Sequence, residues 1–596
     1  MSSFIKSFCS GIRSETVRRF GGVFLFVLLT AANTTARSET FDTIVAGGTV
    51  VDGSGSKPYA ADVGITDGRI VSIGDLSNAQ AEKRIDASGK HIVPGFIDLH
   101  GHADDQQGHW RGMRSPDPVR RAAPAHVSQG ITTSVANSDG LAPFMPLAEQ
   151  LAIVEAYDGT GMNLAYMVPH SRIRFSVLGE DSAREATTEE VKQMHSLIET
   201  DMKAGAWGLA TVLENSDGSW TTTEEFIAMT AALKPFDGAV IAHPRSQSMK
   251  PGWWYPSKHE NKLDESYPLV FDMFQASEEL IKVAEANNLR VSISHLSMRG
   301  PDPNQDALRT VEAVEEARAR GVKIFADMHV TRANPLGIFS PLLPKWAIHA
   351  VPRGASFFIR PNAPHKVKNY QEQLRETLED ESNMAALQKD IPHTVAFWGG
   401  ADEIFITDFP DTDYIGRSLQ ELADMRGLSI VDMVIALGLE GFPDYPGGML
   451  AYGNFRSMEN MERFAKTDWV AGDTDGYLTL PFDPGYIHPR FYGAYPNWLR
   501  TMVIERKAVT LEHAVRSLSG LGADIVGITD RGYIREGYAA DLSVIDLATI
   551  RQRATYYNVH AYSDGFDYVL VNGVPVVAEG KVTMALPGKV LRKELN

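Results

Sequence analysis

Two histidines one residue apart mark the most chemically distinctive segment of the chain, Pro94–Asp104, which reads PGFIDLHGHAD. Side chains at positions i and i+2 of a strand point to the same side. His100 and His102 can therefore reach one metal ion from the end of a strand, and the apolar residues Phe96 and Ile97 before them fit a buried strand. The pattern predicts a metal site; its alternative is a pair of histidines packed at a strand end.

Further metal-ligating side chains follow later apolar runs of the sequence. Four residues share this placement: Asp139, His243, His295 and Asp475. A single histidine after a strand is more often an ordinary core residue. Four histidines and two carboxylates at the same end of their strands are harder to explain by chance, because those ends form one mouth in an α/β barrel. We therefore expect all six groups to surround a common point.

The middle of the chain alternates apolar, strand-like runs with helical stretches. Eight such runs lie between Ile92 and Ala471. This alternation predicts a parallel sheet covered by helices, and eight runs favour an α/β fold of the TIM-like (β/α)8 barrel type. We place the barrel at residues 94–530. The stretch at about 333–466 is too long for one barrel connection, so we expect an inserted lid or subdomain there.

Both ends of the chain have the pattern of short strands and tight turns. Residues 41–93 contain the turns Gly47-Gly48 and Asp67-Gly68, and residues 531–596 contain Asn572-Gly573 between apolar runs. Such turns between alternating apolar residues indicate β-hairpins. We therefore predict a small β-sandwich domain that both termini build together.

The N-terminus has the features of an export signal. Basic residues precede an apolar run from Phe20 to Ala32, and small residues follow up to Ala36. The run is short for a membrane-spanning helix, which needs roughly 20 residues. We predict that residues 1–36 are a signal peptide and that the mature protein is periplasmic or secreted, with no stable membrane span. An uncleaved N-terminal anchor is the alternative.

The amino-acid composition limits both the kind of partner and the side chains that could bind a metal. Acidic residues outnumber basic ones by 75 to 57 among 596 residues, which argues against a nucleic-acid binder. The single cysteine, Cys9, precedes the apolar run, so the mature chain has no thiol and no disulfide. A metal site in this chain must therefore use histidine, aspartate, glutamate or a modified lysine.

The ordered set of motifs resembles the amidohydrolase superfamily and, within it, the N-acyl-D-amino-acid deacylases (D-aminoacylases). The likeness extends from about residue 41 to the C-terminus. Its motifs are Pro94–Asp104, Gly130–Thr133, Gly205–Thr211, Ala242–Arg245, Ser294–Leu296, Thr474–Gly476, His488–Arg490 and Gly537–Leu542.

This resemblance implies one or two divalent metal ions, Zn2+ first, with Mn2+, Fe2+ or Co2+ as alternatives. By motif, His100 and His102 would bind one ion with Asp475, and His243 and His295 would bind the other. Asp139 stands where the family usually has a cysteine shared by both ions. A carboxylate can bridge two metals but is a harder ligand than a thiolate. Capping of a turn is the alternative role for Asp139.

The resemblance also implies the reaction, hydrolysis of the amide bond of an N-acyl amino acid by a metal-activated water. Asp475 would take the proton from that water and pass it to the leaving amine. Arg490, and alternatively Arg245, could hold a substrate carboxylate. Ser297 and His329 stand where the family usually has a lysine and a tyrosine, which puts a plain D-amino-acid substrate in question. His329 is a further candidate for substrate contact, with a structural role as its alternative.

Two other functions fit parts of the pattern. A hydantoinase-like cyclic amidase or a dipeptidase-like amidohydrolase would use similar ligands, usually with a carboxylated lysine, and no lysine stands at a convincing strand end. A non-catalytic binding protein predicts a broken ligand set, which the sequence does not show. The expected partner is a small-molecule amide, and formation of a homo-oligomer is left open. The aromatic loop Pro251–Pro256 could cover a large hydrophobic or aromatic acyl group, and a packed surface loop is the alternative.

Overall fold

The computed structural model describes residues 40–104, 112–182, 184–214, 217–247, 257, 272–297, 303–337, 341–348, 369–483 and 487–594. The predicted signal peptide, Cys9 and the aromatic loop Pro251–Pro256 lie outside the described residues.

Two parallel sheets occupy the middle of the chain. The larger has the order β12-β13-β14-β15-β16-β20, and the smaller has the order β26-β11-β10-β8. All neighbouring strands in both run parallel. The strands of the larger sheet are β12 (Val168–Pro169), β13 (Gly208–Val212), β14 (Ala239–His243), β15 (Val291–Ile293), β16 (Ile324–Met328) and β20 (Val470–Gly472). Those of the smaller sheet are β8 (Phe96–Asp98), β10 (Ile131–Ala136), β11 (Asn163–Tyr166) and β26 (Val590–Leu591).

Backbone hydrogen bonds continue across the border between the two sheets. Met167 N donates to Ala136 O at 3.1 Å, and Trp207 N donates to Tyr166 O at 2.9 Å. A short parallel pair, β9 (Gly101–His102) with β21 (Gly476–Tyr477), links the regions beyond β8 and β20. All residues of β10 and β13 are buried, as expected for parallel strands covered on both faces.

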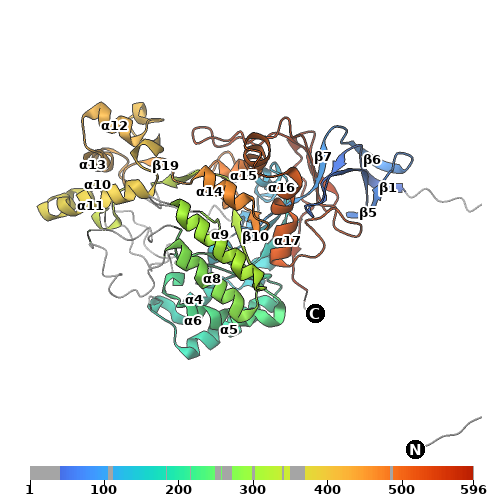
Figure 1. The fold of residues 1–596 in the computed structure, drawn as a ribbon, viewed down its shortest axis with the longest axis horizontal. Helices are drawn as coiled ribbons and strands as arrows, with labels where there is room; N and C mark the ends of the chain where they lie inside the picture. The colour runs from blue at the N-terminus through green and yellow to red at the C-terminus, as the bar shows by residue number, and fades with distance from the viewer. Residues whose placement is uncertain are drawn as a thin grey trace, which may run out of the picture. The chain divides into compact units, whose positions relative to one another are not determined.

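Helices between the strands begin at capping residues that the local sequence supplies. Helix α5 (Thr188–Lys203) begins at Thr187, whose side chain caps the backbone of Glu190. Helix α8 (Met273–Asn287) begins at a similar capping box and lies beside α9 (Pro303–Ala319) (Figure 1). The alternation of parallel strands and helices confirms the predicted mixed α/β class.

Strands from both ends of the chain share one sheet. Its order is β25-β24-β23-β22-β7-β2-β3, and β7 (His91–Pro94) pairs with β22 (Leu542–Ile545) in antiparallel fashion. The other strands of this sheet are β2 (Thr49–Val50), β3 (Tyr59–Ala60), β23 (Phe566–Val571), β24 (Val574–Ala578) and β25 (Lys581–Val582). A second sheet, β5-β4-β1-β6, contains β1 (Thr40–Ala46), β4 (Asp62–Thr66), β5 (Arg69–Gly74) and β6 (Gln80–Asp86).

The segment predicted as an insertion has a sheet and a hydrophobic cluster of its own. Its antiparallel sheet has the order β17-β19-β18, with β17 (Ala333–Leu336), β18 (Ile404–Asp408) and β19 (Leu450–Asn454). Helices α10 (Tyr370–Leu378), α11 (Glu381–Phe397), α12 (Leu419–Arg426) and α13 (Ile430–Glu440) contribute to this cluster, in yellow in Figure 1. Residues Thr40–Asn596 nevertheless form one compact unit, so the domain boundaries at 94, 333, 466 and 531 stay predictions.

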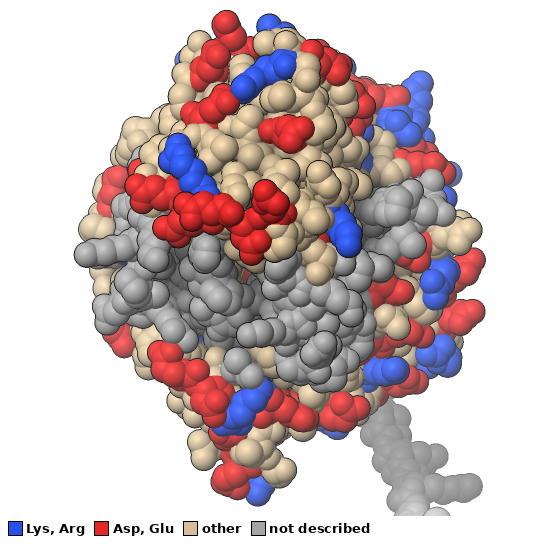
Figure 2. Space-filling view, turned by 90° about the vertical axis from the view of Figure 1, so that its left-hand side faces the viewer, with Lys and Arg blue, Asp and Glu red and all other residues tan. Residues whose placement is uncertain are grey.

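The described surface agrees with the acidic composition. On the face shown in Figure 2, acidic side chains are widely spread and basic ones stand among them without forming a broad patch. In the part of the chain that the structure describes, no helix has both the length and the apolar character needed to cross a membrane.

Candidate metal centre

The six predicted ligands all lie at or just after the carboxyl ends of parallel strands: His100, His102, Asp139, His243, His295 and Asp475. Three of them, Asp139, His295 and Asp475, have positive φ angles of 57°, 34° and 43°. A left-handed backbone costs about 1–2 kcal/mol for a residue with a β-carbon. Such strain persists where the surrounding structure imposes it, and it is common at functional sites.

Asp139 lies among four imidazoles. Its Oδ1 is 3.4 Å from His100 Nε2, 3.5 Å from His243 Nδ1 and 3.9 Å from His295 Nε2. Its Oδ2 is 3.9 Å from His102 Nε2. Imidazoles from the ends of β8, β14 and β15 therefore meet at the carboxylate that follows β10.

Two overlapping groups of side chains have the spacing of a metal site. In each group, one ligand atom per residue lies within 4.8 Å of the others. The first group is His100, Asp139 and His295, and the second is His100, His102 and Asp475. His102 Nε2 is 3.2 Å from Asp475 Oδ1. Because His100 belongs to both groups, the arrangement suits two neighbouring cation positions or one position between them.

Polar atoms at this point lack the partners that buried polar atoms normally have. Both ring nitrogens of His100, Oδ1 of Asp139 and Nδ1 of His243 are buried and make no hydrogen bond within the described residues. An unpaired buried polar group costs about 1–3 kcal/mol. A divalent cation bound by these nitrogen and oxygen atoms would remove that cost, and imidazole and carboxylate are ligands that zinc accepts. The donor set therefore fits a metal ion.

The two carboxylates of the centre are held in their charged form. Burial favours the neutral acid, but His100 and His243 hold the pKa of Asp139 well below its usual range. Burial also opposes the ionisation of Asp475, whose pKa is held well below its usual range by Arg490 first and then by His102. Both groups are anions at neutral pH and can attract a cation.

His243 and His295, which both approach Asp139, differ in the pKa of their imidazoles. Burial lowers the pKa of His243, but Asp139 and Glu214 overcome this and raise it to about 9. Burial and the neighbouring His243 hold the pKa of His295 well below its usual value. In the metal-free protein His243 therefore carries a proton that a bound cation would displace.

Two buried carboxylates beneath the centre hold the ligand-bearing loops. Asp98 accepts hydrogen bonds from the backbone N of Thr474 at 2.9 Å and from its Oγ1 at 2.7 Å. Asp327 accepts one from the backbone N of His295 at 2.6 Å. The sequence reasoning missed both, because an acidic residue inside an apolar strand leaves the strand pattern intact.

Glu214 and Gln247 are further polar residues that the sequence reasoning missed. Glu214 Oε2 lies 2.9 Å from His243 Nε2. Gln247 Nε2 lies 3.1 Å from His243 Nε2 and 3.1 Å from His295 Nδ1. Glu214 follows the end of β13 by two residues, so the rule that selected His295 after β15 could have selected it too.

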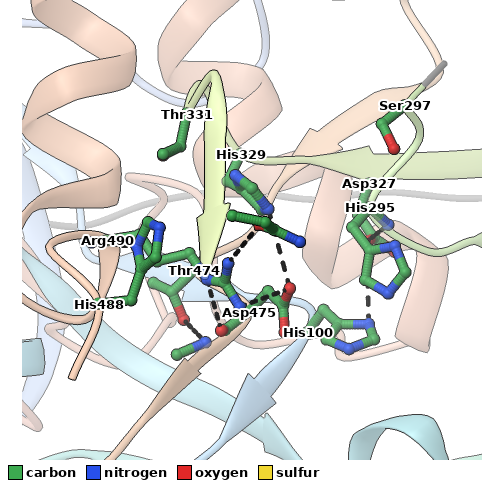
Figure 3. A network of polar contacts seen from close by, with 12 residues as sticks. His100, His295, Ser297, Asp327, His329, Thr331, Thr474, Asp475, His488 and Arg490 are labelled. Atoms are coloured by element: carbon green, nitrogen blue, oxygen red, sulfur yellow. Dashed lines mark hydrogen bonds and ion pairs between the residues drawn. The ribbon is translucent and has the colours of Figure 1, made fainter. Parts of the chain in front are cut away.

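The predicted substrate-contact residues Arg490 and His329 lie beside Asp475 (Figure 3). Arg490 Nη2 is 2.8 Å from Asp475 Oδ2, its Nε donates to the Asp475 carbonyl oxygen, and its Nη1 donates to Asn334 Oδ1 at 2.9 Å. His329 Nε2 is 3.8 Å from Asp475 Oδ2. Burial first, and then Arg456 and Arg490, hold the pKa of His329 well below its usual value.

Arg245, the alternative anchor for a substrate carboxylate, has a structural role in the described protein. Its guanidinium is only 2% exposed and donates to both carboxylate oxygens of Glu279, at 3.0 and 2.8 Å. It also donates to the carbonyl oxygens of Ser219 and Thr221. These contacts engage its guanidinium with Glu279 and two backbone carbonyls, so the role of Arg245 as a substrate anchor stays a prediction.

Comparisons with known proteins find similar proteins along nearly the whole chain. Residues 419–577 match the model of an amidohydrolase family. The chain is 29% identical to a D-aminoacylase of Alcaligenes xylosoxydans xylosoxydans over 579 residues. This alignment covers 93% of the present chain and 98% of the D-aminoacylase.

Two solved structures are similar over 93% of this chain and the whole of theirs. One is an N-acyl-D-glutamate deacylase from Bordetella bronchiseptica in complex with zinc and a phosphonate inhibitor, with a TM-score of 0.67 and 24% identity. The other is a D-aminoacylase with a binuclear metal center, with a TM-score of 0.66 and 25% identity.

Proposed function

The chain is related over nearly its whole length to the D-aminoacylase branch of the amidohydrolase superfamily, and from this relationship we propose its reaction and its site. It is a metal-dependent hydrolase that cleaves the C–N amide bond of an N-acyl amino acid or a similar amide. The products are a carboxylate and a free amine.

One observation carries the proposal more than any other. Buried imidazoles from separate strand ends converge on the Asp139 carboxylate, and several of their ring nitrogens have no hydrogen-bond partner among the described residues. A site that only stabilised the fold would pair such atoms, because unpaired buried polar groups are costly. Histidine and aspartate arranged in this way are ligands for a divalent cation.

We assign the ligands to two positions that share Asp139. His100 and His102 with Asp475 form one position, and His243 with His295 forms the other. Zn2+ fits this nitrogen and oxygen set, and Mn2+, Fe2+ or Co2+ could replace it. The similar D-aminoacylase structure has a binuclear metal center, and the similar glutamate deacylase holds zinc. Both support a divalent metal in this chain.

When bound, a divalent cation activates a water molecule as a nucleophile near neutral pH and polarises the substrate carbonyl. Asp475 performs the proton transfers. Its Oδ2 pairs with Arg490 and its Oδ1 lies near His102, and the low pKa of its carboxyl keeps it in the ionised form, which has no proton of its own. It takes the proton of the attacking water and delivers it to the leaving nitrogen. Arg490 orients Asp475, and His329 borders the same space.

The strand arrangement supports a closed TIM-like (β/α)8 barrel around this site. The two parallel sheets are connected through β9 and β21 on one side and through the hydrogen bond from Trp207 to Tyr166 on the other. We further propose a barrel at 94–530 with an insertion at about 333–466, and a β-sandwich from 41–93 and 531–596. The site in such a barrel lies at the carboxyl ends of the strands.

We also propose that the protein is exported. Residues 1–36 would direct the chain across the membrane, and their cleavage would release the mature enzyme into the periplasm or the medium. Fractionation of cells that express the full chain, with N-terminal sequencing of the recovered protein, tests it. An N-terminus at Met1 in the cytoplasmic fraction would refute it.

The test of the function is a substrate screen on metal-depleted and reloaded protein. Purified protein is treated with a chelator, reloaded with zinc, manganese or cobalt, and assayed on N-acyl amino acids of both configurations. We expect metal-dependent release of a free amino acid. Hydrolysis of hydantoins or dipeptides alone would favour the cyclic amidase or dipeptidase alternative. A protein that retains no metal would favour the non-catalytic alternative.

A further inference from the structure

We propose that Gln247 is a positioning residue that sets the tautomers of His243 and His295, and thereby controls how tightly the second cation position binds metal. The inference rests on the proposed function, because it concerns two of the proposed ligands. The glutamine lies between the two rings, on the side that faces away from Asp139.

The contacts to Asp139 identify which ring nitrogen of each histidine faces the cation. His243 approaches Asp139 Oδ1 through Nδ1, at 3.5 Å, and His295 approaches the same atom through Nε2, at 3.9 Å. A neutral imidazole binds metal through the nitrogen that lacks a proton. Both histidines can act as ligands only if His243 is protonated on Nε2 and His295 on Nδ1.

Those two outer nitrogens meet one side-chain amide. Gln247 Nε2 lies 3.1 Å from His243 Nε2 and 3.1 Å from His295 Nδ1, and the residue is 2% exposed. Its Oε1 accepts a hydrogen bond from the Ser297 hydroxyl at 2.9 Å. Glu214 Oε2 lies 2.9 Å from His243 Nε2 as a second acceptor.

The partners decide which end of the amide faces the rings. The oxygen and nitrogen of a glutamine amide are nearly isosteric, and the hydrogen-bond network distinguishes them. In the structure the amide nitrogen faces the rings. With metal bound, the two protonated ring nitrogens need an acceptor, so the amide turns over and its oxygen faces His243 and His295. The amide nitrogen then donates to Ser297, whose hydroxyl can accept.

This arrangement has the physical role of an outer partner in a metal site. A group that accepts the outer N–H of a ligating histidine fixes the ring, selects its tautomer and increases its basicity. Loss of such a partner typically weakens metal binding by about 10- to 100-fold. Here one amide serves two ligands, and it is the side-chain partner that the described contacts give to His295 Nδ1.

The experiment compares Gln247→Leu with Gln247→Glu in the full chain. Leucine keeps the volume but removes the acceptor, whereas glutamate keeps an acceptor at the same place. Zinc affinity and stoichiometry are measured by competition with a chromogenic chelator, and the cobalt protein is examined by visible absorption. Gln373→Leu is the matched control, because Gln373 is a buried glutamine of α10 outside the ligand cluster.

We expect Gln247→Leu to bind one of the two metals about 10- to 100-fold more weakly and to change the cobalt spectrum, while Gln247→Glu and Gln373→Leu bind as the wild type does. Unchanged affinity and spectrum in Gln247→Leu, or an equal loss in Gln247→Glu, would overturn the inference. If Gln247→Leu does not fold, Ser297→Ala is measured in its place. A several-fold loss of zinc affinity is expected for this variant, and an unchanged zinc affinity would contradict the inference. Failure of the wild type to bind metal would instead refute the proposed function.

Discussion

Replacement of Asp475 by asparagine tests the proposed proton transfer, and metal at the His243/His295 position should be retained. Asparagine has nearly the same shape and tolerates the positive φ of 43° at this position. Its amide oxygen can still accept a hydrogen bond from Arg490, but the side chain can no longer take up a proton. The substitution therefore removes the charge of the carboxylate and keeps its place in the loop.

The expected loss is larger in catalysis than in stability. A positioned acid–base group contributes about 100- to 10,000-fold to the rate, which corresponds to roughly 3–5 kcal/mol of activation free energy. Removing a hydrogen-bonded partner charge from a buried ion pair can cost 3–5 kcal/mol of stability, but an accepting amide oxygen limits this to about 1–3 kcal/mol. We expect kcat to fall at least 100-fold, with KM changed less than severalfold.

The assay measures kcat and KM on the best substrate of the screen, with metal content determined on the same samples. Asp201→Asn is the matched control, because Asp201 is a buried carboxylate paired with Arg172 away from the centre. We expect the control to lose stability but to keep kcat. An Asp475→Asn protein with its metal retained and a kcat within tenfold of the wild type would refute the assigned role.

Three further predictions follow from individual contacts. Arg245→Met should lower the free energy of unfolding in urea by about 3–5 kcal/mol, because Glu279 is left buried without its partner. The KM of this variant should be unchanged, and a raised KM at normal stability would indicate that Arg245 contacts the substrate. Because the pKa of His243 is about 9 without metal, zinc binding at pH 7 should release a proton, and the zinc affinity should increase as the pH rises towards about 9. Calorimetry in buffers of different ionisation enthalpy measures this proton release, and its absence would refute the prediction. Asp139→Asn should reduce the bound metal by about one equivalent, since Asp139 lies among ligands of both positions, and metal analysis that still finds two equivalents would contradict its bridging role.

Several features could be predicted from the sequence because short-range rules govern them. The spacing of His100 and His102 places both side chains on one side of a strand, and apolar runs before His243 and His295 mark the strand ends. Where a run is buried on both faces, its composition alone indicates a parallel strand. The mixed α/β class and the candidate ligands follow from these local patterns.

Other features depend on which side chains meet, and local patterns carry little information about that. Glu214 and Gln247 contact histidines that lie up to 48 residues away, and Arg490 meets a residue 15 positions earlier. Arg245 and Arg490 both follow proline in the sequence, yet one pairs with Glu279 and the other with Asp475. A guanidinium binds whichever carboxylate the packing of the strands and helices brings within reach.

The sequence by itself thus determined the order of strands and helices, the residue types available for a metal and the end of the sheet at which they lie. Only the tertiary structure decided that His100, His243 and His295 approach one oxygen of Asp139, and which arginine orients Asp475. The reason is physical: periodicity reports the face and the end of an element, whereas distances between side chains depend on long-range packing and on the backbone angles where each strand ends.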